Sequence, residues 1–134
     1  MIKPAKISVR FADCDMMGHV NNAVYLSYFE EARMHYVAQM VDENWNWKKD
    51  GIILVKNEVT YLKPILLHDE PSIHIKLKAI GTSSFTLVYD VKVNDETAAK
   101  GESKLVCFDF TSQQPVSVYP KMVEGLEQLE KITD

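Results

Sequence analysis

The chain has 134 residues, of which 46% are hydrophobic and 25% are charged, and its formal net charge is −4. This length fits one domain, assigned here to residues 1–134, and the composition is that of an ordinary globular protein. The negative charge and the lack of a Lys/Arg cluster argue against binding to nucleic acid or to a membrane surface. The chain starts without the apolar stretch of a signal peptide and contains no apolar run of about 20 residues, so we expect a cytoplasmic protein. Its two cysteines, Cys14 and Cys107, are too few for a disulfide framework or, by themselves, a zinc site.

The N-terminal part of the sequence predicts a strand followed by a long helix. Residues 5–12 alternate apolar and polar side chains, which is typical of a strand. Residues 22–41 contain neither Pro nor Gly, and apolar side chains cover most of the circumference of the helix that they would form. Such a helix is expected to be buried. Asn21 or Asn22 is well placed to cap its first turn.

The rest of the chain predicts strands and one short helix. The strands are expected at about residues 52–62, 72–80, 84–93 and 98–110. Turn residues at 81–82 and 94–95 make neighbouring strands antiparallel, and Pro120 begins a short C-terminal helix. The element order predicts an α+β fold in which a five-stranded antiparallel sheet curls around the central helix. Because one such sheet cannot enclose the helix completely, we expect at least a dimer.

The densest group of chemically active side chains lies in the loop that leads into the long helix. It comprises two carboxylates, Asp13 and Asp15, the imidazole of His19, and the amides of Asn21 and Asn22. A calcium-binding loop that begins at Asp13 is excluded, because its fifth and twelfth residues are apolar and provide no side-chain oxygen ligand. A transition-metal site lacks enough nearby His and Cys ligands. We therefore predict no metal here.

Two catalytic interpretations of this loop remain. Cys14 with His19 as its base is weak, because strand alternation turns the cysteine away from both aspartates. The alternative is a carboxylate beside the helix N-terminus, where the N–H groups near Asn22 stabilise a developing oxyanion. Such a carboxylate attacks a thioester carbonyl or activates water. A structural role in capping turns stays open for Asp13, whereas chemistry is favoured for Asp15.

The segment from Asp15 to Arg33, with its His-Val-Asn-Asn stretch at residues 19–22, resembles the hotdog-fold acyl-CoA thioesterases of the 4-hydroxybenzoyl-CoA thioesterase type. The similarity continues in short stretches as far as residues 100–106, and it covers about residues 5–130. The resemblance implies a hotdog fold, a five-stranded antiparallel sheet wrapped around a long central helix, with a short C-terminal helix. It also implies hydrolysis of an acyl thioester to the free acid and a thiol.

The resemblance further implies roles for residues of the loop and the helix. Asp15 corresponds to the catalytic carboxylate, a nucleophile or general base, and the backbone N–H of Asn22 to the donor that polarises the thioester carbonyl. His19 and Asn21 correspond to residues that shape the site. We count His19 with the catalytic residues and Asn21 with those that bind substrate. Tyr25, one turn into the helix, is expected either to line the acyl pocket as a substrate contact or to pack in the core.

Other expectations concern the substrate and the assembly. Asn57 interrupts an apolar series and is either a substrate contact or a buried amide with a structural hydrogen bond. Some members of the family hold nucleotide phosphates with basic residues at a turn that is uncharged here, and Ser83 and Ser84 of this turn are assigned to substrate binding. Glu30 and Arg33 have the spacing of an ion pair on a helix. No cofactor is expected, since coenzyme A is part of the substrate.

The resemblance places the active site at a dimer interface, so we expect a homodimer or a homotetramer. Two alternatives to an acyl-CoA thioesterase stay open. One is a thioesterase that acts on acyl carrier protein, and the other is a non-catalytic module that binds an acyl chain or a carrier.

Overall fold

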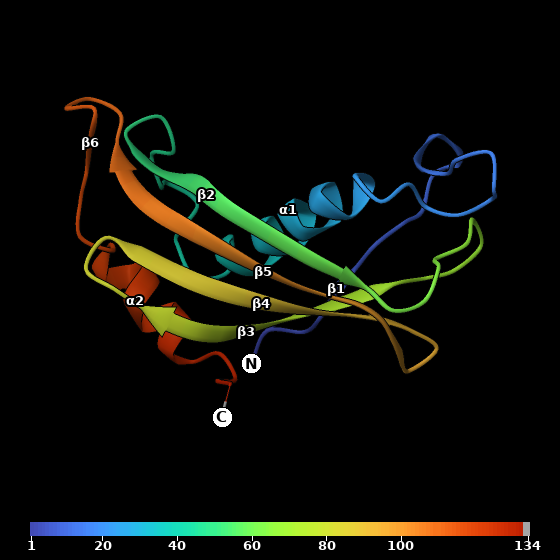
Figure 1. Ribbon diagram of the computed structural model, residues 1–134. Helices are drawn as coiled ribbons and strands as arrows, with labels where there is room; N and C mark the ends of the chain where they lie inside the picture. The colour runs from blue at the N-terminus through green and yellow to red at the C-terminus, as the bar shows by residue number, and fades with distance from the viewer. Residues whose placement is uncertain (133–134) are drawn as a thin grey trace.

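Four long antiparallel strands make up most of the sheet in this computed structural model, which describes residues 1–132 (Figure 1). They are β2 (Asp50–Tyr61), β3 (Ser72–Ile80), β4 (Ser84–Val93) and β5 (Glu96–Asp109). The strand order is β1-β3-β4-β5-β2, with the two-residue β1 (Ala5–Lys6) at one edge. A second two-residue strand, β6 (Gln114–Pro115), pairs with β5 and was not predicted. The bounds of β3 and β4 are those predicted, and the bounds of β2 and β5 differ from the prediction by at most two residues.

The turn between β4 and β5 explains why these strands were predictable. Asn94 and Asp95 have φ angles of 51° and 66°, the left-handed conformation that a two-residue hairpin turn requires. Asparagine and aspartate adopt this conformation more easily than most residues. The turn is therefore encoded locally, and it fixes the antiparallel pairing of the two strands.

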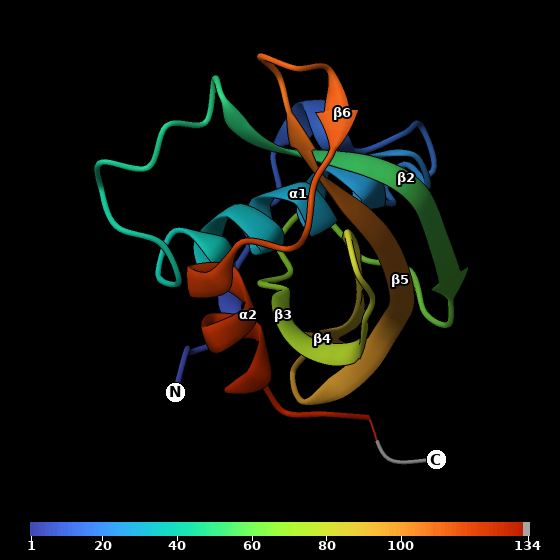
Figure 2. The ribbon, with the colours of Figure 1, turned by 90° about the vertical axis from the view of Figure 1, so that its left-hand side faces the viewer.

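The central helix α1 (Val24–Val37) lies within the curl of the sheet (Figure 2). Its buried side chains are Tyr25, Tyr28, Phe29, Ala32, Arg33, Tyr36 and Val37. The prediction of an all-round buried helix over 22–41 is wrong in two respects. Helix α1 ends at Val37, after which Gln39 and Met40 make turn hydrogen bonds to carbonyls three residues earlier. The outer face of the helix is also open, since Met34 is 65% exposed.

A short helix, α2 (Pro120–Glu127), packs across one end of the structure, with Met122 and Leu126 fully buried. It begins at a proline, as predicted, because proline at the first helical position sacrifices no internal hydrogen bond. Gly125 faces Met40, which follows α1, and a Cβ atom on this glycine would lie 2.5 Å from the Met40 side chain. The absence of a side chain at residue 125 thus allows α2 to approach the end of α1.

The predicted strand over residues 5–12 is wrong beyond Lys6. Residues Phe11–Asp13 form a single turn of 3-10 helix, η1, and Phe11 is exposed although alternation placed it with the apolar residues. The Asp13 carboxylate accepts a hydrogen bond from the backbone N–H of Arg10 at 3.0 Å. This bond, together with the N–H of Asp13 donating to the Arg10 carbonyl at 2.9 Å, turns the chain and ends the extended segment.

Asp13 also ties this turn to the central helix. Its side chain is only 2% exposed. The carboxylate accepts a 2.7 Å hydrogen bond from the Tyr28 hydroxyl, and two more, of 2.9 and 3.2 Å, from the Arg10 guanidinium. Burial acts to raise the pKa of Asp13, but the hydrogen bonds from Arg10 and Tyr28 outweigh it and hold this pKa below its ordinary value. Burial and the neighbouring carboxylate raise the pKa of Tyr28. The structural role left open for Asp13 is therefore the one that the contacts support.

Asp13→Asn should lower the free energy of unfolding at pH 7 by about 2 kcal/mol, because an amide loses the charge-assisted bonds to Arg10 and Tyr28. The folded-state pKa of Asp13 lies below the unfolded value of about 3.9, so the carboxylate stabilises the fold above that pH and loses its contribution as the pH falls through the folded-state pKa. Urea unfolding of both proteins should show a constant difference between pH 7 and pH 5 that shrinks below about pH 4. A difference that persists unchanged in acid would contradict this role.

Gly101 in β5 lies beneath an aromatic stack. The rings of Phe29 and Tyr89 are parallel within 2° at a centroid distance of 4.2 Å, and a Cβ atom at residue 101 would collide with the Phe29 ring. Gly101→Ala should therefore destabilise the protein by about 1–3 kcal/mol in thermal or urea unfolding. The same substitution should cost less in a Phe29→Leu background, where the smaller side chain makes room. Equal costs in both backgrounds would show that the ring is not the obstacle.

Candidate active site at the start of the central helix

The loop before α1 is a short hairpin. Cys14 and Val20 pair as an isolated antiparallel bridge, and the N–H of Asp15 donates to the His19 carbonyl at 2.8 Å. Gly18 closes the turn with a φ of 79° and donates its N–H to the Asp15 carbonyl at 3.0 Å. Glycine adopts this left-handed conformation without a steric penalty. The local sequence therefore specifies a tight turn with Asp15 and His19 facing each other across it.

Backbone groups hold the Asp15 side chain. Its Oδ1 atom accepts hydrogen bonds from the N–H of Met17 at 2.9 Å and from the N–H of His19 at 3.3 Å. Its Oδ2 atom receives no hydrogen bond from residues 1–132, and the side chain is exposed. One carboxylate oxygen is thus fixed by the turn, and the other is available to a substrate.

The start of α1 presents a free backbone donor beside this hairpin. The N-cap of α1 is Ala23 and no side chain caps it, so the prediction of Asn21 or Asn22 as the N-cap is wrong. Asn21 instead forms the turn before the helix: its Oδ1 accepts from the N–H of Ala23 at 2.9 Å and its carbonyl from the N–H of Val24 at 2.9 Å. The carbonyl of Asn22 accepts a 2.7 Å hydrogen bond from the Tyr61 hydroxyl. No group of residues 1–132 accepts the N–H of Asn22. This N–H lies at the positive end of the helix dipole, where it can stabilise an anion.

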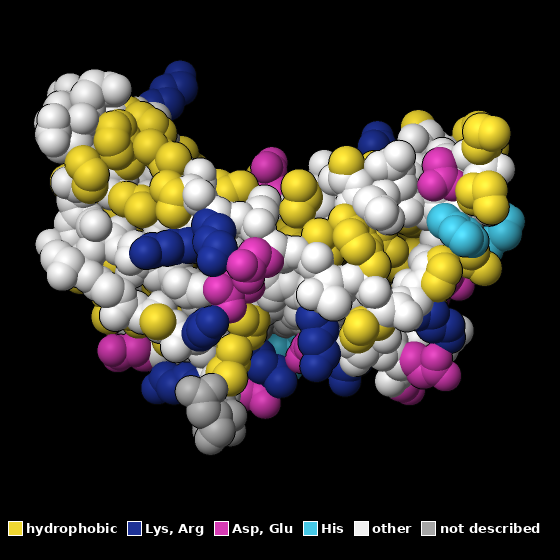
Figure 3. Space-filling model, viewed as in Figure 1, with side chains coloured by type: hydrophobic (Ala, Val, Ile, Leu, Met, Phe, Trp, Pro, Cys, Tyr) yellow, Lys and Arg dark blue, Asp and Glu magenta, His cyan; other side chains and the backbone are white. Residues whose placement is uncertain are grey.

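A pocket of 190 Å³ opens at this end of the helix. Its lining residues are His19, Val20, Asn22, Tyr25, Tyr61, Leu62, Lys63 and Pro64. Tyr25 is buried and meets the Tyr61 ring edge to face at 4.9 Å. The pocket therefore brings together His19, Asn22 and Tyr25, which lie close in sequence, with residues at the end of β2. Around it, hydrophobic and histidine side chains gather at the end of the molecule formed by the 10–22 and 62–71 loops (Figure 3).

Sequence reasoning did not assign Tyr61 to the site. In the sequence, a tyrosine at the end of a strand indicates only a side chain that packs against its neighbours. Its hydrogen bond to the carbonyl of Asn22 forms only in the folded sheet. Lys63 also lines the pocket and pairs with Glu96 at 2.5 Å. The hydrogen bond to Glu96 and the charge of this carboxylate raise the pKa of Lys63, which keeps a cation at the pocket.

The remaining predicted substrate contacts lie elsewhere in the chain. Asn57, in β2, accepts a hydrogen bond from the Ser103 hydroxyl, the structural arrangement favoured for a buried amide. Ser83 and Ser84 precede and begin β4 at the opposite end of the sheet. Ser84 pairs with Val106 of β5, whereas Tyr61 pairs with Ala99 of the same strand. These two positions on β5 are seven residues apart, which corresponds to about 23 Å along the strand. The chain does not bring these serines to the helix start, so their role stays a prediction that requires a second subunit.

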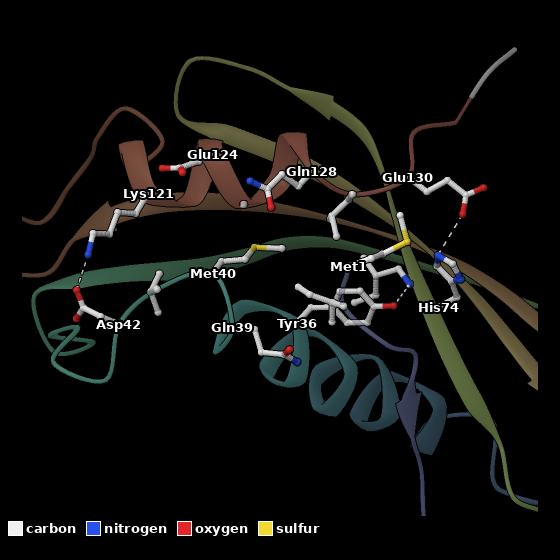
Figure 4. A pocket seen from close by; sticks show the side chains of 15 residues that line it. Met1, Tyr36, Gln39, Met40, Asp42, His74, Lys121, Glu124, Gln128 and Glu130 are labelled. Atoms are coloured by element: carbon white, nitrogen blue, oxygen red, sulfur yellow. Dashed lines mark hydrogen bonds and ion pairs between the residues drawn. The ribbon is translucent and has the colours of Figure 1, made fainter.

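A cavity of 440 Å³ lies between α2, the end of α1 and β3, and is lined by none of the site residues predicted from the sequence (Figure 4). Two pairs of polar side chains lie at its rim: His74 with Glu130 at 3.3 Å, and Lys121 with Asp42 at 2.5 Å. No residue of the hairpin before α1 lines it. The helix start is therefore the better candidate for chemistry.

Among residues 1–132, no three His, Cys, Asp or Glu side chains are grouped so that they could hold a metal ion. Within the same residues, no helix has the length and apolar character needed to cross a membrane.

Comparison with known proteins adds a family to this geometry. Residues 9–126 match the model of the thioesterase-like superfamily. The chain is 38% identical to YsmA of Bacillus subtilis over 86 residues, an alignment that covers 63% of this chain and 56% of that protein. It is 28% identical to the long-chain acyl-CoA thioesterase FadM of Escherichia coli over 129 residues, which cover 94% of this chain and 98% of FadM.

A solved structure agrees with these relatives. A thioesterase of Thermus thermophilus, determined in complex with coenzyme A and Zn, superposes with a TM-score of 0.82 and 37% sequence identity. The match covers 95% of this chain and 92% of that one. The hotdog fold implied by the sequence resemblance is thereby confirmed, and the protein belongs to the thioesterase-like superfamily.

Proposed function

We propose that the protein hydrolyses acyl thioesters of coenzyme A to a free acid and coenzyme A, with its chemistry at the start of α1. The observation that carries this proposal is the placement of a carboxylate with one free oxygen, on Asp15, in the hairpin that leads directly to the free N–H of Asn22. The relative named as an acyl-CoA thioesterase and the coenzyme A complex of the Thermus thioesterase support the substrate class.

The proposed chemistry follows from these two groups. In one route the free oxygen of Asp15 takes a proton from water, and the hydroxide adds to the thioester carbonyl carbon. In the other it attacks that carbon itself, and water then hydrolyses the resulting anhydride. In both routes the carbonyl oxygen becomes an oxyanion that the N–H of Asn22 stabilises, and collapse breaks the carbon–sulfur bond. The thiolate leaves and is protonated, so that the net reaction consumes one water molecule.

The surrounding side chains suit the binding of such a substrate. His19 and Tyr25 line the pocket at the helix start, and Asn21 holds the first turn in position. Lys63 offers a cation at the pocket for the anionic coenzyme. These contacts support the proposal that the protein is a thioesterase of the 4-hydroxybenzoyl-CoA type.

We also propose that the active protein is at least a dimer. Strand β2 is the last strand of the sheet, so one edge of it pairs with no other named strand within residues 1–132. Val55 on this strand is an exposed apolar side chain, which a second subunit would cover. Light scattering on the purified protein should give at least twice the mass of the chain. A monomer with full thioesterase activity would contradict this assembly.

Asp15→Asn should lower kcat/KM for acyl-CoA hydrolysis by about 100-fold, because the amide can neither accept the proton nor attack the carbonyl. Its Oδ1 can still accept the N–H groups of Met17 and His19, so the melting temperature should stay close to that of the wild type. The matched control is Asp95→Asn in the β4–β5 turn, where asparagine tolerates the left-handed backbone. Thiol release from a panel of acyl-CoA chain lengths measures both variants.

The same panel separates the alternatives. Equal rates for wild type and Asp15→Asn would remove this carboxylate from the chemistry. Saturable binding of acyl-CoA by the wild type without thiol release would refute hydrolysis and indicate a binding module.

A further inference from the structure

A second cavity, of 420 Å³, lies beside the C-terminal half of α1 between the helix and the sheet. We call it the α1 groove. It is lined by Glu30, Arg33, Met34, Val37, Ala38, Trp47, Ile52, Leu54, Phe85, Leu87 and Leu105. All of these side chains are apolar except the first two. Arg33 lies eleven residues from Asn22 along the helix, a rise of about 16 Å, so the groove is separate from the pocket at the helix start.

Arg33 is the unusual residue of the α1 groove. It is only 9% exposed, yet its guanidinium makes a single hydrogen bond to residues 1–132, from Nη1 to the Tyr89 hydroxyl at 3.1 Å. No carboxylate of residues 1–132 lies within ion-pair distance of it, so the pair predicted with Glu30 is wrong. No buried side-chain nitrogen of residues 1–132 lacks a hydrogen-bond partner, so the other nitrogens of this guanidinium are not fully buried. The remaining N–H donors of Arg33 are therefore available to an anion.

The side chain of Tyr89 fixes the position of the Arg33 guanidinium. Tyr89 stacks on Phe29 with the rings parallel at 4.2 Å, and its hydroxyl also interacts with the buried Ser103. A rigid hydroxyl thus holds one nitrogen of the guanidinium. Because the guanidinium is planar, this contact restricts the direction in which its other donors point. Such preorganisation lowers the entropy cost of binding a ligand.

We propose that the α1 groove binds a carboxylate carried on an apolar chain, with Arg33 as the charged anchor. The guanidinium matches the two oxygens of a carboxylate, and side chains such as Leu87 and Leu105 contact the apolar chain. Glu30 lines the same groove and is exposed, and its charge repels an anion. The carboxylate therefore lies at the Arg33 side of the groove, with the apolar chain filling the rest.

Two molecules have this chemistry if the proposed function holds: a free carboxylic acid, which is the product of hydrolysis, and an acyl-CoA whose acyl chain ends in a second carboxylate. The groove itself is argued from its own geometry, and only the source of the ligand rests on the proposed function.

The test is calorimetric titration of the intact protein with sodium octanoate and with octanamide, its uncharged counterpart. The wild type should bind octanoate more tightly than octanamide. Arg33→Met should weaken octanoate binding by about tenfold or more and leave octanamide binding unchanged, since it removes a charge-assisted pair but keeps an apolar side chain of similar length. Equal octanoate affinity in both proteins, or no binding to the wild type because a second copy of the chain covers the groove, would overturn the proposal.

Two further variants distinguish the loss of the Arg33 anchor from a general loss of octanoate binding. Arg33→Lys keeps the charge without the planar fork, so its octanoate affinity should lie between those of the wild type and Arg33→Met. Glu30→Gln is the matched control on the same groove, and it should bind octanoate as tightly as the wild type or more tightly. Weaker binding by Glu30→Gln would show that Arg33 does not act as the anion anchor. Circular dichroism on each variant establishes that it is folded.

A second arm identifies the source of the carboxylate. Turnover of suberoyl-CoA and of octanoyl-CoA is compared in the wild type and in Arg33→Met. A preference for suberoyl-CoA that Arg33→Met abolishes assigns the ligand to the acyl chain, whereas octanoate binding without such a preference assigns it to the free acid. Octanoate binding that depends on Arg33 in a protein that releases no thiol would refute the proposed function and leave the groove standing. Thiol release by a protein whose octanoate binding does not depend on Arg33 would refute the proposed groove site and leave the proposed function standing.

Discussion

The buried carboxylate of Asp13 fixes the geometry at the start of the central helix. Its side chain accepts a hydrogen bond from Tyr28 on α1, and its backbone carbonyl accepts the N–H of Asn21 at 2.9 Å. One residue therefore holds both the helix and the end of the hairpin that precedes it. A buried carboxylate is costly unless hydrogen-bond donors surround it. Few other arrangements of this segment would therefore have a similar energy. Asp15 and Asn22, which lie on either side of the hairpin turn, are placed relative to each other by this contact.

The curled sheet determines which parts of α1 remain accessible. It covers one face of the helix with aromatic and aliphatic side chains, and α2 closes the end near Met40. The start of the helix stays open and carries the small pocket, while the outer side carries the α1 groove. The two cavities differ in chemistry, since one is lined by Asn22, which has a free N–H, and the other has a guanidinium among apolar side chains. The fold thus offers two separate binding environments along a single helix.

The strands and the core of the site could be predicted because they are encoded locally. Alternation and the Asn94–Asp95 turn define β4 and β5, and Asp15 to Tyr25 form one continuous segment. The errors arise from contacts between distant residues. The first strand ends early because of the Asp13 turn, which Tyr28 completes from 15 residues away. Tyr61 joins the pocket only when β2 folds beside α1, and the Glu30–Arg33 pair fails because Tyr89, 56 residues away, takes the guanidinium.

The central claim is that the helix start binds and polarises the thioester carbonyl. A crystal structure with a non-hydrolysable acyl-CoA analogue, in which a methylene group separates the carbonyl carbon from sulfur, tests it most directly. The analogue's carbonyl oxygen is predicted to accept the N–H of Asn22 at about 2.9 Å, with the free oxygen of Asp15 facing the carbonyl carbon. An analogue whose carbonyl lies in the cavity between α1 and α2, with the N–H of Asn22 left in solvent, would contradict the account.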